Sequence, residues 1–159
     1  MITVRRAAPD DAKRVHNLME KADQPGTLPF DSFREIYLDT LADKNQACVV
    51  VTVDTAVTAF GTVRFNMLLH RCKPVATVQE FVVDERRRGK GVAARLISAM
   101  MLLARDRGCV SLEVDSPRAS KQSHRFFEKQ GFAFTHYKLA MTIGLAADED
   151  GALQQASQD

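Results

Sequence analysis

Hydrophobic residues recur along this chain with two periods, one typical of helices and one typical of strands. Apolar positions three and four residues apart predict helices over 9–22, 30–41, 91–107 and 120–130. Apolar runs rich in β-branched residues predict strands over 2–7, 48–53, 57–68, 75–83 and 110–114, and 132–143 is a final extended stretch. Consecutive strands come first and a strand–helix–strand unit follows, so the predicted fold class is mixed α/β.

Turn residues separate these elements. Asp54-Thr55 predicts a tight turn between two strands, and the prolines and glycine of Gln24–Pro29 predict a loop. Gly108 is placed to end the long helix, and Gly131 to end the last one. Because no repeat or linker divides the 159 residues, we expect a single domain over 1–144, followed by an acidic, Gln/Ala-rich tail over 145–159.

Charge and composition argue against several classes of protein. The chain has 22 Lys and Arg against 20 Asp and Glu, a formal net charge of +2 that does not favour a nucleic-acid or membrane partner. It has no Trp and two Tyr, so an aromatic platform for bases is not expected. No apolar run approaches the roughly 20 residues that a membrane-spanning helix needs, and no secretory signal is visible. Three cysteines without zinc-like spacing predict free thiols, no metal site and a cytoplasmic location.

The segment Gln79–Ala93 carries the clearest chemistry. A strand here runs through a charged turn containing Gly89 and Gly91 into the long helix. Glycines let the backbone approach a ligand closely, and the N–H groups at a helix start attract anions. Positive charge is added by Arg86, Arg87, Arg88 and Lys90. A phosphate or pyrophosphate ligand is therefore predicted; the alternative is a solvated basic turn with a capping glycine.

The letters of this turn resemble those of a known family. Arg88-x-x-Gly91-x-Ala93 is similar to the acetyl-CoA motif of the GCN5-related N-acetyltransferases, and a second register, Arg86-x-x-Gly89-x-Gly91, also fits. We prefer the first, which leaves the family's usual spacing between the strand and the first glycine. Downstream, His124–Phe132 resembles the Phe-Tyr-Glu-Lys-x-Gly-Phe ending of the family.

The resemblance spans about Ile2–Ile143 and has direct implications. It implies a mainly antiparallel central sheet flanked by helices, with acetyl-CoA as co-substrate and an amine as acetyl acceptor. The pantetheine arm is expected along the strand at 81–83, which splays from the strand at 110–114, and the Val83 N–H is expected to polarise the thioester carbonyl. The implied cofactor-binding residues are Phe81, Val82, Val83, Arg88, Gly89, Lys90, Gly91, Val92, Ala93 and Ser120. Ser120 has an alternative role as the N-cap of its helix.

An attacking amine has to lose a proton, which calls for a general base. Glu80 is the candidate, because it is a carboxylate in an apolar strand beside the cofactor residues, and the family often has Glu there. Strict alternation places Glu80 on one face with Val78 and Val82, and Phe81 with Val83 on the other. The alternative is a carboxylate at the sheet surface or in a structural ion pair.

The acid that the family uses for the departing thiolate is missing. Phe127 stands where relatives usually have Tyr, and a phenyl ring cannot donate a proton. Ser123, His124 and Tyr137 are the nearby replacements. A CoA thiolate also leaves without strong acid help, so we do not expect a dedicated acid.

The leading interpretation is an acetyl-CoA-dependent N-acetyltransferase acting on a small primary amine. The chain also loosely resembles the aminoalkylphosphonate N-acetyltransferases. This likeness implies that Arg64, His70 or Arg71 faces an anionic group of the substrate. The alternatives are a non-catalytic acyl-CoA sensor or partner subunit, and an acetyltransferase of protein amino groups. The resemblance also makes a homodimer possible.

Overall fold

The computed structural model describes residues 1–22 and 26–144, and the chain divides into two compact units, Met1–Val114 and Asp115–Asp159. The tail predicted at 145–159 lies outside the described residues, and the expectation of a single domain over 1–144 stays a prediction.

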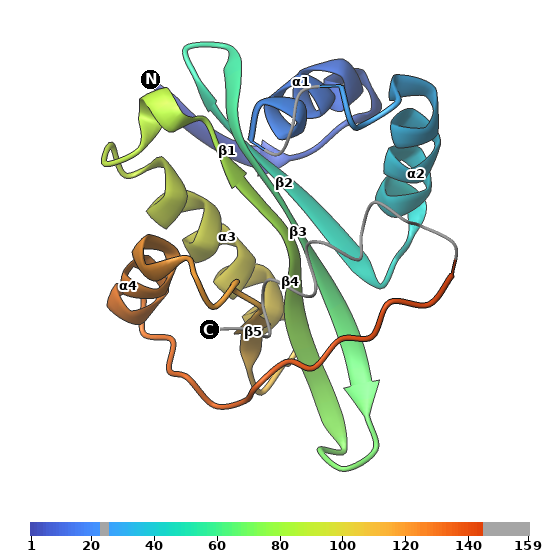
Figure 1. Ribbon diagram of the computed structural model, residues 1–159, viewed down its shortest axis with the longest axis vertical. Helices are drawn as coiled ribbons and strands as arrows, with labels where there is room; N and C mark the ends of the chain where they lie inside the picture. The colour runs from blue at the N-terminus through green and yellow to red at the C-terminus, as the bar shows by residue number, and fades with distance from the viewer. Residues whose placement is uncertain (23–25, 145–159) are drawn as a thin grey trace. The chain divides into compact units, whose positions relative to one another are not determined.

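The first unit is built on a five-stranded sheet. Its strands are β1 (Ile2–Arg6), β2 (Gln46–Val53), β3 (Ala56–Leu68), β4 (Lys73–Val83) and β5 (Leu112–Val114), in that spatial order. The first four pair antiparallel, and β5 joins β4 in parallel (Figure 1). The predicted mixed α/β class and mainly antiparallel sheet are confirmed.

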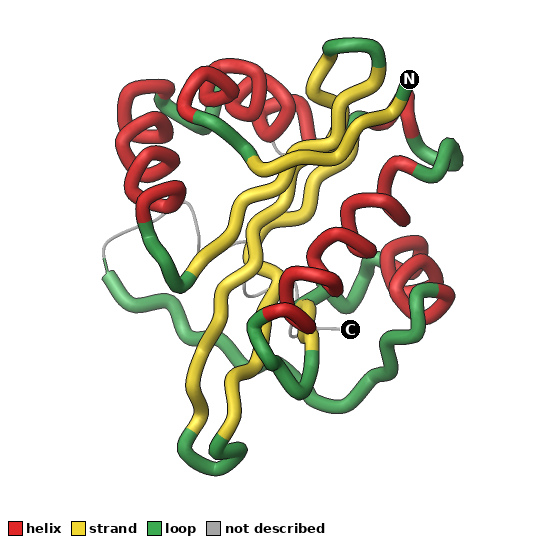
Figure 2. Tube along the Cα trace, turned by 180° about the vertical axis from the view of Figure 1, so that it is seen from behind, coloured by secondary structure: helices red, strands yellow, loops and turns green. Residues whose placement is uncertain are grey.

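Helices cover both faces of this sheet. The 3₁₀ turn η1 (Pro9–Asp11) leads into α1 (Ala12–Ala22), α2 is Phe30–Ala42, and the 3₁₀ turn η2 (Glu85–Arg87) precedes α3 (Val92–Asp106). Helices α1 and α2 lie on one face and α3 on the other, as Figures 1 and 2 show from opposite sides. β2 is accordingly buried on both faces through Ala47–Val51, as its apolar sequence predicts.

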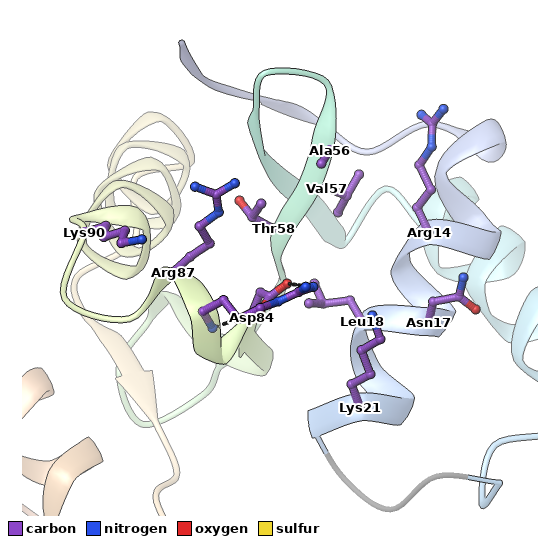
Figure 3. Close-up of a pocket in the computed structure, with 11 residues that line it drawn as sticks. Arg14, Asn17, Leu18, Lys21, Ala56, Val57, Thr58, Asp84, Arg87 and Lys90 are labelled. Atoms are coloured by element: carbon purple, nitrogen blue, oxygen red, sulfur yellow. Dashed lines mark hydrogen bonds and ion pairs between the residues drawn. The ribbon is translucent and has the colours of Figure 1, made fainter.

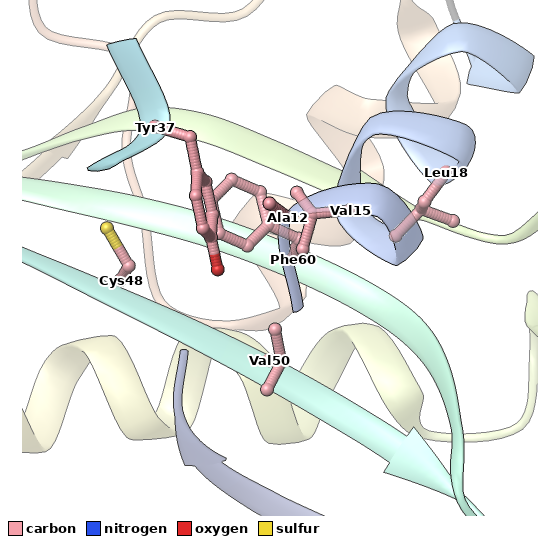
Figure 4. Packing of buried hydrophobic residues seen from close by; sticks show 7 residues of the cluster. All are labelled: Ala12, Val15, Leu18, Tyr37, Cys48, Val50 and Phe60. Atoms are coloured by element: carbon pink, nitrogen blue, oxygen red, sulfur yellow. The ribbon is translucent and has the colours of Figure 1, made fainter. Parts of the chain in front are cut away.

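Under α1 and α2 the core is a cluster of small aliphatic and aromatic side chains (Figure 4). The members are Ala12, Val15, Leu18, Tyr37, Cys48, Val50 and Phe60. Burial raises the pKa of the Cys48 thiol to about 11, so this cysteine is a packing residue rather than a nucleophile. The Tyr37 hydroxyl donates to the Ala8 carbonyl oxygen at 2.7 Å, and burial raises its pKa as well.

An ion pair between exposed Arg5 and buried Asp11 ties β1 to η1, the turn that leads into α1. The Asp11 carboxylate is 2% exposed and accepts from Arg5 at 2.6 and 2.8 Å and from the Ala8 N–H at 2.9 Å. The hydrogen bond from Arg5 lowers the pKa of Asp11 below its ordinary value. Asp11 therefore has two roles at the start of this helical segment: it interacts favourably with the helix dipole, and it accepts hydrogen bonds from Arg5 and from the Ala8 N–H.

On the opposite face α3 packs closely on the sheet. The α3 side chains of Leu96 and Met100 are fully buried against the sheet. A Cβ added to Gly61 of β3 would overlap the terminal methyl of Met100 and come within 3.0 Å of the Glu80 carbonyl oxygen. The absence of a side chain at Gly61 is therefore what lets α3 approach this part of β3.

Strand β4 contains a bulge beside the predicted site. Thr62 of β3 pairs with Glu80, and the next residue, Val63, pairs with Val78, so Gln79 is the extra residue. Val63 belongs to the core cluster under α3, which places Val78 on that face, opposite to Glu80. The prediction that Val78 and Glu80 share a face is wrong, because the bulge shifts the alternation by one residue.

Both ends of α3 use glycine in the left-handed conformation. Gly91 is the N-cap residue with φ 77°, and Gly108 follows the C-cap with φ 71°. At the C-terminal end, the Gly108 N–H donates to Arg105 and the Cys109 N–H to Ala104, the pattern of a Schellman motif. The predicted role of Gly108 is confirmed.

In the second unit the one helix among residues 115–144 is α4 (Lys121–Lys129). Phe127 is buried there, with its ring against Phe126 and Phe132 at centroid distances of 5.1 and 5.4 Å. The stretch predicted to be extended, 132–143, forms neither helix nor strand.

Candidate functional site

The turn after β4 has the backbone that an anion site requires. Gly89 and Gly91 have φ of 73° and 77°, a region that side chains disfavour. A Cβ added to either glycine would meet no protein atom within 4 Å. Both glycines therefore face open space, and backbone conformation rather than crowding explains why they lack side chains.

The start of α3 presents N–H groups at this turn. The first helical hydrogen bond runs from the Arg95 N–H to the Gly91 oxygen at 3.1 Å, so the N–H groups of Val92, Ala93 and Ala94 have no acceptor within the helix. Together with the positive end of the helix dipole, they favour a negatively charged ligand.

The cationic side chains of the turn do not all point at one spot. Arg86 is held by Asp84, which accepts from its Nε and Nη2 at 3.2 and 3.1 Å, and these bonds lower the pKa of Asp84. Arg88 lies 3.5 Å from Glu85, and both side chains are exposed. Such a surface pair contributes only about 0–1 kcal/mol, so Arg88 is available to a stronger anion at little cost.

The end of β4 extends beyond its pairing with β5, and we call this side of β4 the open edge because no strand of the described residues pairs with it there. The β4–β5 pairing stops at Val78 and Val114, and no register pair joins β5 to residues 79–83. On the other side, the Asp84 N–H donates to the Thr58 oxygen at 2.8 Å. Because hydrogen-bonded and non-bonded pairs alternate in an antiparallel ladder, the neighbouring Val83 directs its N–H away from β3, toward the open edge.

Glu80 lies at the same stretch of β4. It shares the face of α1 and α2 with Val82, while Phe81 pairs with Gly61 and faces α3, as alternation after the bulge requires. The Glu80 side chain is exposed, and the Glu80 backbone N–H donates to the Thr62 hydroxyl at 3.2 Å. The bulge thus presents a carboxylate beside the strand edge.

A cleft of about 500 Å³ opens between α1, the start of β3 and the turn after β4 (Figure 3). Among the predicted cofactor residues, Lys90 alone lines it. The remaining lining residues are Arg14, Asn17, Leu18, Lys21, Ala56, Val57, Thr58, Asp84, Arg86 and Arg87. Sequence reasoning missed the contribution of α1, although the seven-residue spacing of Arg14 and Lys21 was a usable signal.

Two of the three residues proposed to replace the missing acid form hydrogen bonds within the second unit, and the third is exposed. The His124 ring bonds the Pro117 oxygen at 2.8 Å, and Ser123 shares a 2.7 Å hydroxyl–hydroxyl bond with Ser120. Tyr137 is 90% exposed. Ser120 occupies the N-cap position of α4, but its hydroxyl bonds Ser123 instead of a backbone N–H, so the predicted capping bond is not made.

Two of the three candidates for an anionic substrate group lie away from this site. His70 and Arg71 are in the β3–β4 turn, at the opposite end of β4 from Val83. At about 3.3 Å per residue, the length of β4 puts that turn some 30 Å from the glycine turn. Arg64 lies 3.6 Å from Asp43 and Arg71 lies 3.9 Å from Glu113. His70 and Arg71 are therefore far from Glu80, whereas Arg64 is two residues along β3 from Thr62, the register partner of Glu80, and lies on the same face of the sheet.

In the described part of the chain, no group of three or more His, Cys, Asp or Glu side chains is arranged to hold a metal ion. None of the described helices is both long enough and apolar enough to span a membrane.

The sheet, the glycine turn and the open edge of β4 define an α/β protein whose strand–helix junction is suited to a negatively charged ligand. The family model of the acetyltransferase (GNAT) family matches residues 13–132. The chain belongs to this family, and it is an acetyl-CoA-dependent N-acetyltransferase.

Two named enzymes are similar to this chain in sequence, and a solved structure is similar to it in fold. The aminoalkylphosphonate N-acetyltransferase of Salmonella typhimurium is 21% identical over 140 residues, covering 88% of this chain and 90% of the relative. The aminoglycoside N(6')-acetyltransferase type 1 of Serratia marcescens is 31% identical over 114 residues, covering 70% and 78%. A solved structure described as a transcriptional regulator from Bacillus halodurans C-125 superposes with a TM-score of 0.81 at 22% identity, covering 90% of this chain and 100% of that one.

Proposed function

We propose that this protein moves the acetyl group of acetyl-CoA directly to the primary amine of a small molecule. The observation that carries the proposal is the combination of the glycine turn with the open edge at the end of β4. One feature suits a pyrophosphate and the other suits an extended, peptide-like arm, and acetyl-CoA has both.

The residues present fit acetyl-CoA. The N–H groups of Val92 and Ala93 would bind the pyrophosphate, with Arg88 and Lys90 adding charge, because Gly89 and Gly91 leave the approach open. The edge at 81–83 would pair with the pantetheine arm, as a strand edge pairs with an extended peptide. Ser120 remains a proposed cofactor contact. When bound, acetyl-CoA supplies the thioester whose carbonyl carbon an amine attacks.

Val83 is proposed to stabilise the charge that develops on the thioester oxygen. Its N–H points to the open edge, and the β3–β4 ladder holds its position. A preorganised donor of this kind contributes roughly 3–4 kcal/mol in other enzymes.

Glu80 is proposed as the general base. Its carboxylate takes the proton that the amine loses as the new N–C bond forms, directly or through a water molecule. The thiolate leaves with the electrons of the broken C–S bond and takes its proton from solvent, since Phe127 offers none. The bulge at Gln79 supports this role, because it places Glu80 beside the strand edge.

A small-molecule acceptor is favoured by the relatives, since both enzymes quoted above are named for small amines. Free thiols and the near-neutral charge support a cytoplasmic enzyme without a nucleic-acid partner, and a homodimer is compatible with the proposal.

The test is thiol release from acetyl-CoA with a panel of an aminoalkylphosphonate, an aminoglycoside, a polyamine, an amino acid and a peptide. Thiol release with a small amine is expected. Release with the peptide alone would instead identify a protein acetyltransferase. Binding of acetyl-CoA without release with any amine would identify a non-catalytic acyl-CoA sensor.

A further inference from the structure

The cleft lined by α1, the start of β3 and the turn after β4 is a second concentration of positive charge. Among the described residues, five cationic side chains and one carboxylate line it, a formal charge of +4, whereas the whole chain has a net charge of +2. Most of the acetyl-CoA machinery proposed above is absent from its lining, including both glycines of the turn and residues 80–83.

The charges in this cleft come from distant parts of the sequence. Arg14, Asn17, Leu18 and Lys21 form one stripe of α1, since they are spaced three, four and seven residues apart. Figure 3 shows this stripe across the gap from Arg87 and Lys90. The tertiary fold therefore assembles the cluster, although neither segment contains it alone.

In the described part of the chain, few of these cations form a close ion pair, although Lys21 and Arg87 interact at longer range with Asp84 and Asp54. Among the described residues that line the cleft, Asp84 is the one acidic residue, and Arg86 donates to both of its carboxylate oxygens. Lys21, Arg87 and Lys90 form no ion pair of 4.0 Å or less in the described part of the chain. Arg14 reaches Asp11 only at 4.0 Å, because Arg5 holds that carboxylate at 2.6 Å.

The walls add shape and hydrogen-bonding groups to the charge. Leu18 and Val57 provide apolar surface, and the Asn17 side chain offers an amide donor from the same helix stripe. A volume of about 500 Å³ is in the range of small-ligand sites. Like charges gathered around such a space repel one another, and a multivalent anion removes that repulsion.

We infer that this cleft is a second anion-binding site, which takes a small ligand carrying at least two phosphate charges; it shares Lys90 with the proposed pyrophosphate site but contains neither Gly89 nor Gly91. The site has no part in the acyl-transfer step. Its occupant is either a free phosphorylated metabolite or a phosphate group of acetyl-CoA itself, and the inference commits to the first.

Inorganic pyrophosphate is the probe. Its binding is measured by titration calorimetry at constant ionic strength, first to the protein alone and then with acetyl-CoA at saturation. The variant is Arg14→Gln with Lys21→Gln, which removes two cleft charges and leaves the turn unchanged. The matched control is Lys44→Gln with Arg105→Gln, which removes two exposed charges outside the cleft.

We expect pyrophosphate to bind with acetyl-CoA present, and its Kd to rise at least tenfold in the cleft variant and less than threefold in the control. If pyrophosphate binding weakens equally in both variants, the loss of net positive charge alone explains the effect, and the inference is overturned. Loss of pyrophosphate binding once acetyl-CoA is saturating would also overturn it, because the cleft would then belong to the cofactor. Failure of acetyl transfer leaves this comparison intact, since the titrations measure binding of pyrophosphate and not turnover.

Discussion

Replacing Gly91 by Glu is the sharpest test of the glycine turn. The residue has φ 77°, and a Cβ there meets no protein atom, so the new side chain extends into the space that the pyrophosphate is proposed to occupy. Its carboxylate would compete for the N–H groups at the start of α3. We expect the variant to fold and to lose acetyl-CoA binding.

The size of the lost effect follows from mass action. A ligand at about 100 times its Kd stabilises the native state by roughly 2.7 kcal/mol. For a chain of this length, each kcal/mol raises Tm by about 2–4 °C, so acetyl-CoA should raise the Tm of the wild-type protein by roughly 5–11 °C. The left-handed backbone costs an L-residue about 1–2 kcal/mol, which lowers the Tm of the unliganded variant separately.

Gly108 supplies the matched control at the other end of the same helix. Its φ is 71° and its Cβ position is also open, so Gly108→Glu carries the same backbone strain. A negative charge stabilises a helix start and destabilises a helix end by about 0.3–1 kcal/mol each. Gly108→Glu should therefore have the lower Tm without ligand, and yet it should keep the full rise with acetyl-CoA.

Thermal melts of the three proteins with and without acetyl-CoA decide the matter. The ligand-induced rise in Tm is the quantity compared, since backbone strain cancels in it. A Gly91→Glu protein that keeps the wild-type rise would refute the assignment of the phosphate turn. Equal loss of the rise in both variants would show that strain in α3, rather than a blocked site, is responsible.

Four further substitutions test the site and the core. Glu80→Gln should lower kcat/KM at least about tenfold near neutral pH, with the gap narrowing at high pH as the amine deprotonates unaided; wild-type rates over pH 6–9 would remove the base role. Phe127→Tyr should hold or raise kcat while the fold survives, and a steady-state assay that finds a tenfold fall would show that this position does not tolerate a hydroxyl. Asp11→Asn should cost about 1–3 kcal/mol in urea denaturation at pH 7. Because the pKa of Asp11 is lowered in the folded protein, the stability it gives is present above the ordinary value of 3.8 and is lost as pH falls through the folded value, so the gap should close in acid; a constant gap would contradict the ion-pair explanation. Gly61→Ala should lower the free energy of unfolding by about 1–3 kcal/mol, because the added Cβ overpacks against Met100. An unchanged Tm would show that the Met100 side chain moves aside without loss of stability.

The local elements of this protein were determined by the sequence. Apolar periodicity predicts both helices of the first half, α3 and the main strands to within a few residues, because the periods of helix and strand differ and burial selects one face. Glycines at 89, 91 and 108 were recognisable because a left-handed backbone strongly favours glycine. The phosphate turn needs only neighbouring residues, so it too could be read from the chain.

Tertiary structure decided which residues meet. The bulge at Gln79 moved Val78 to the face opposite Glu80, and it depends on the register with β3 rather than on any letter of β4. The cations of the turn differ in their partners, since Asp84 holds Arg86 and Glu85 lies beside Arg88, whereas Arg87 forms no ion pair of 4.0 Å or less in the described part of the chain. Periodicity reports what each segment buries, whereas pairing, register and the approach of distant segments depend on contacts between residues far apart in the chain.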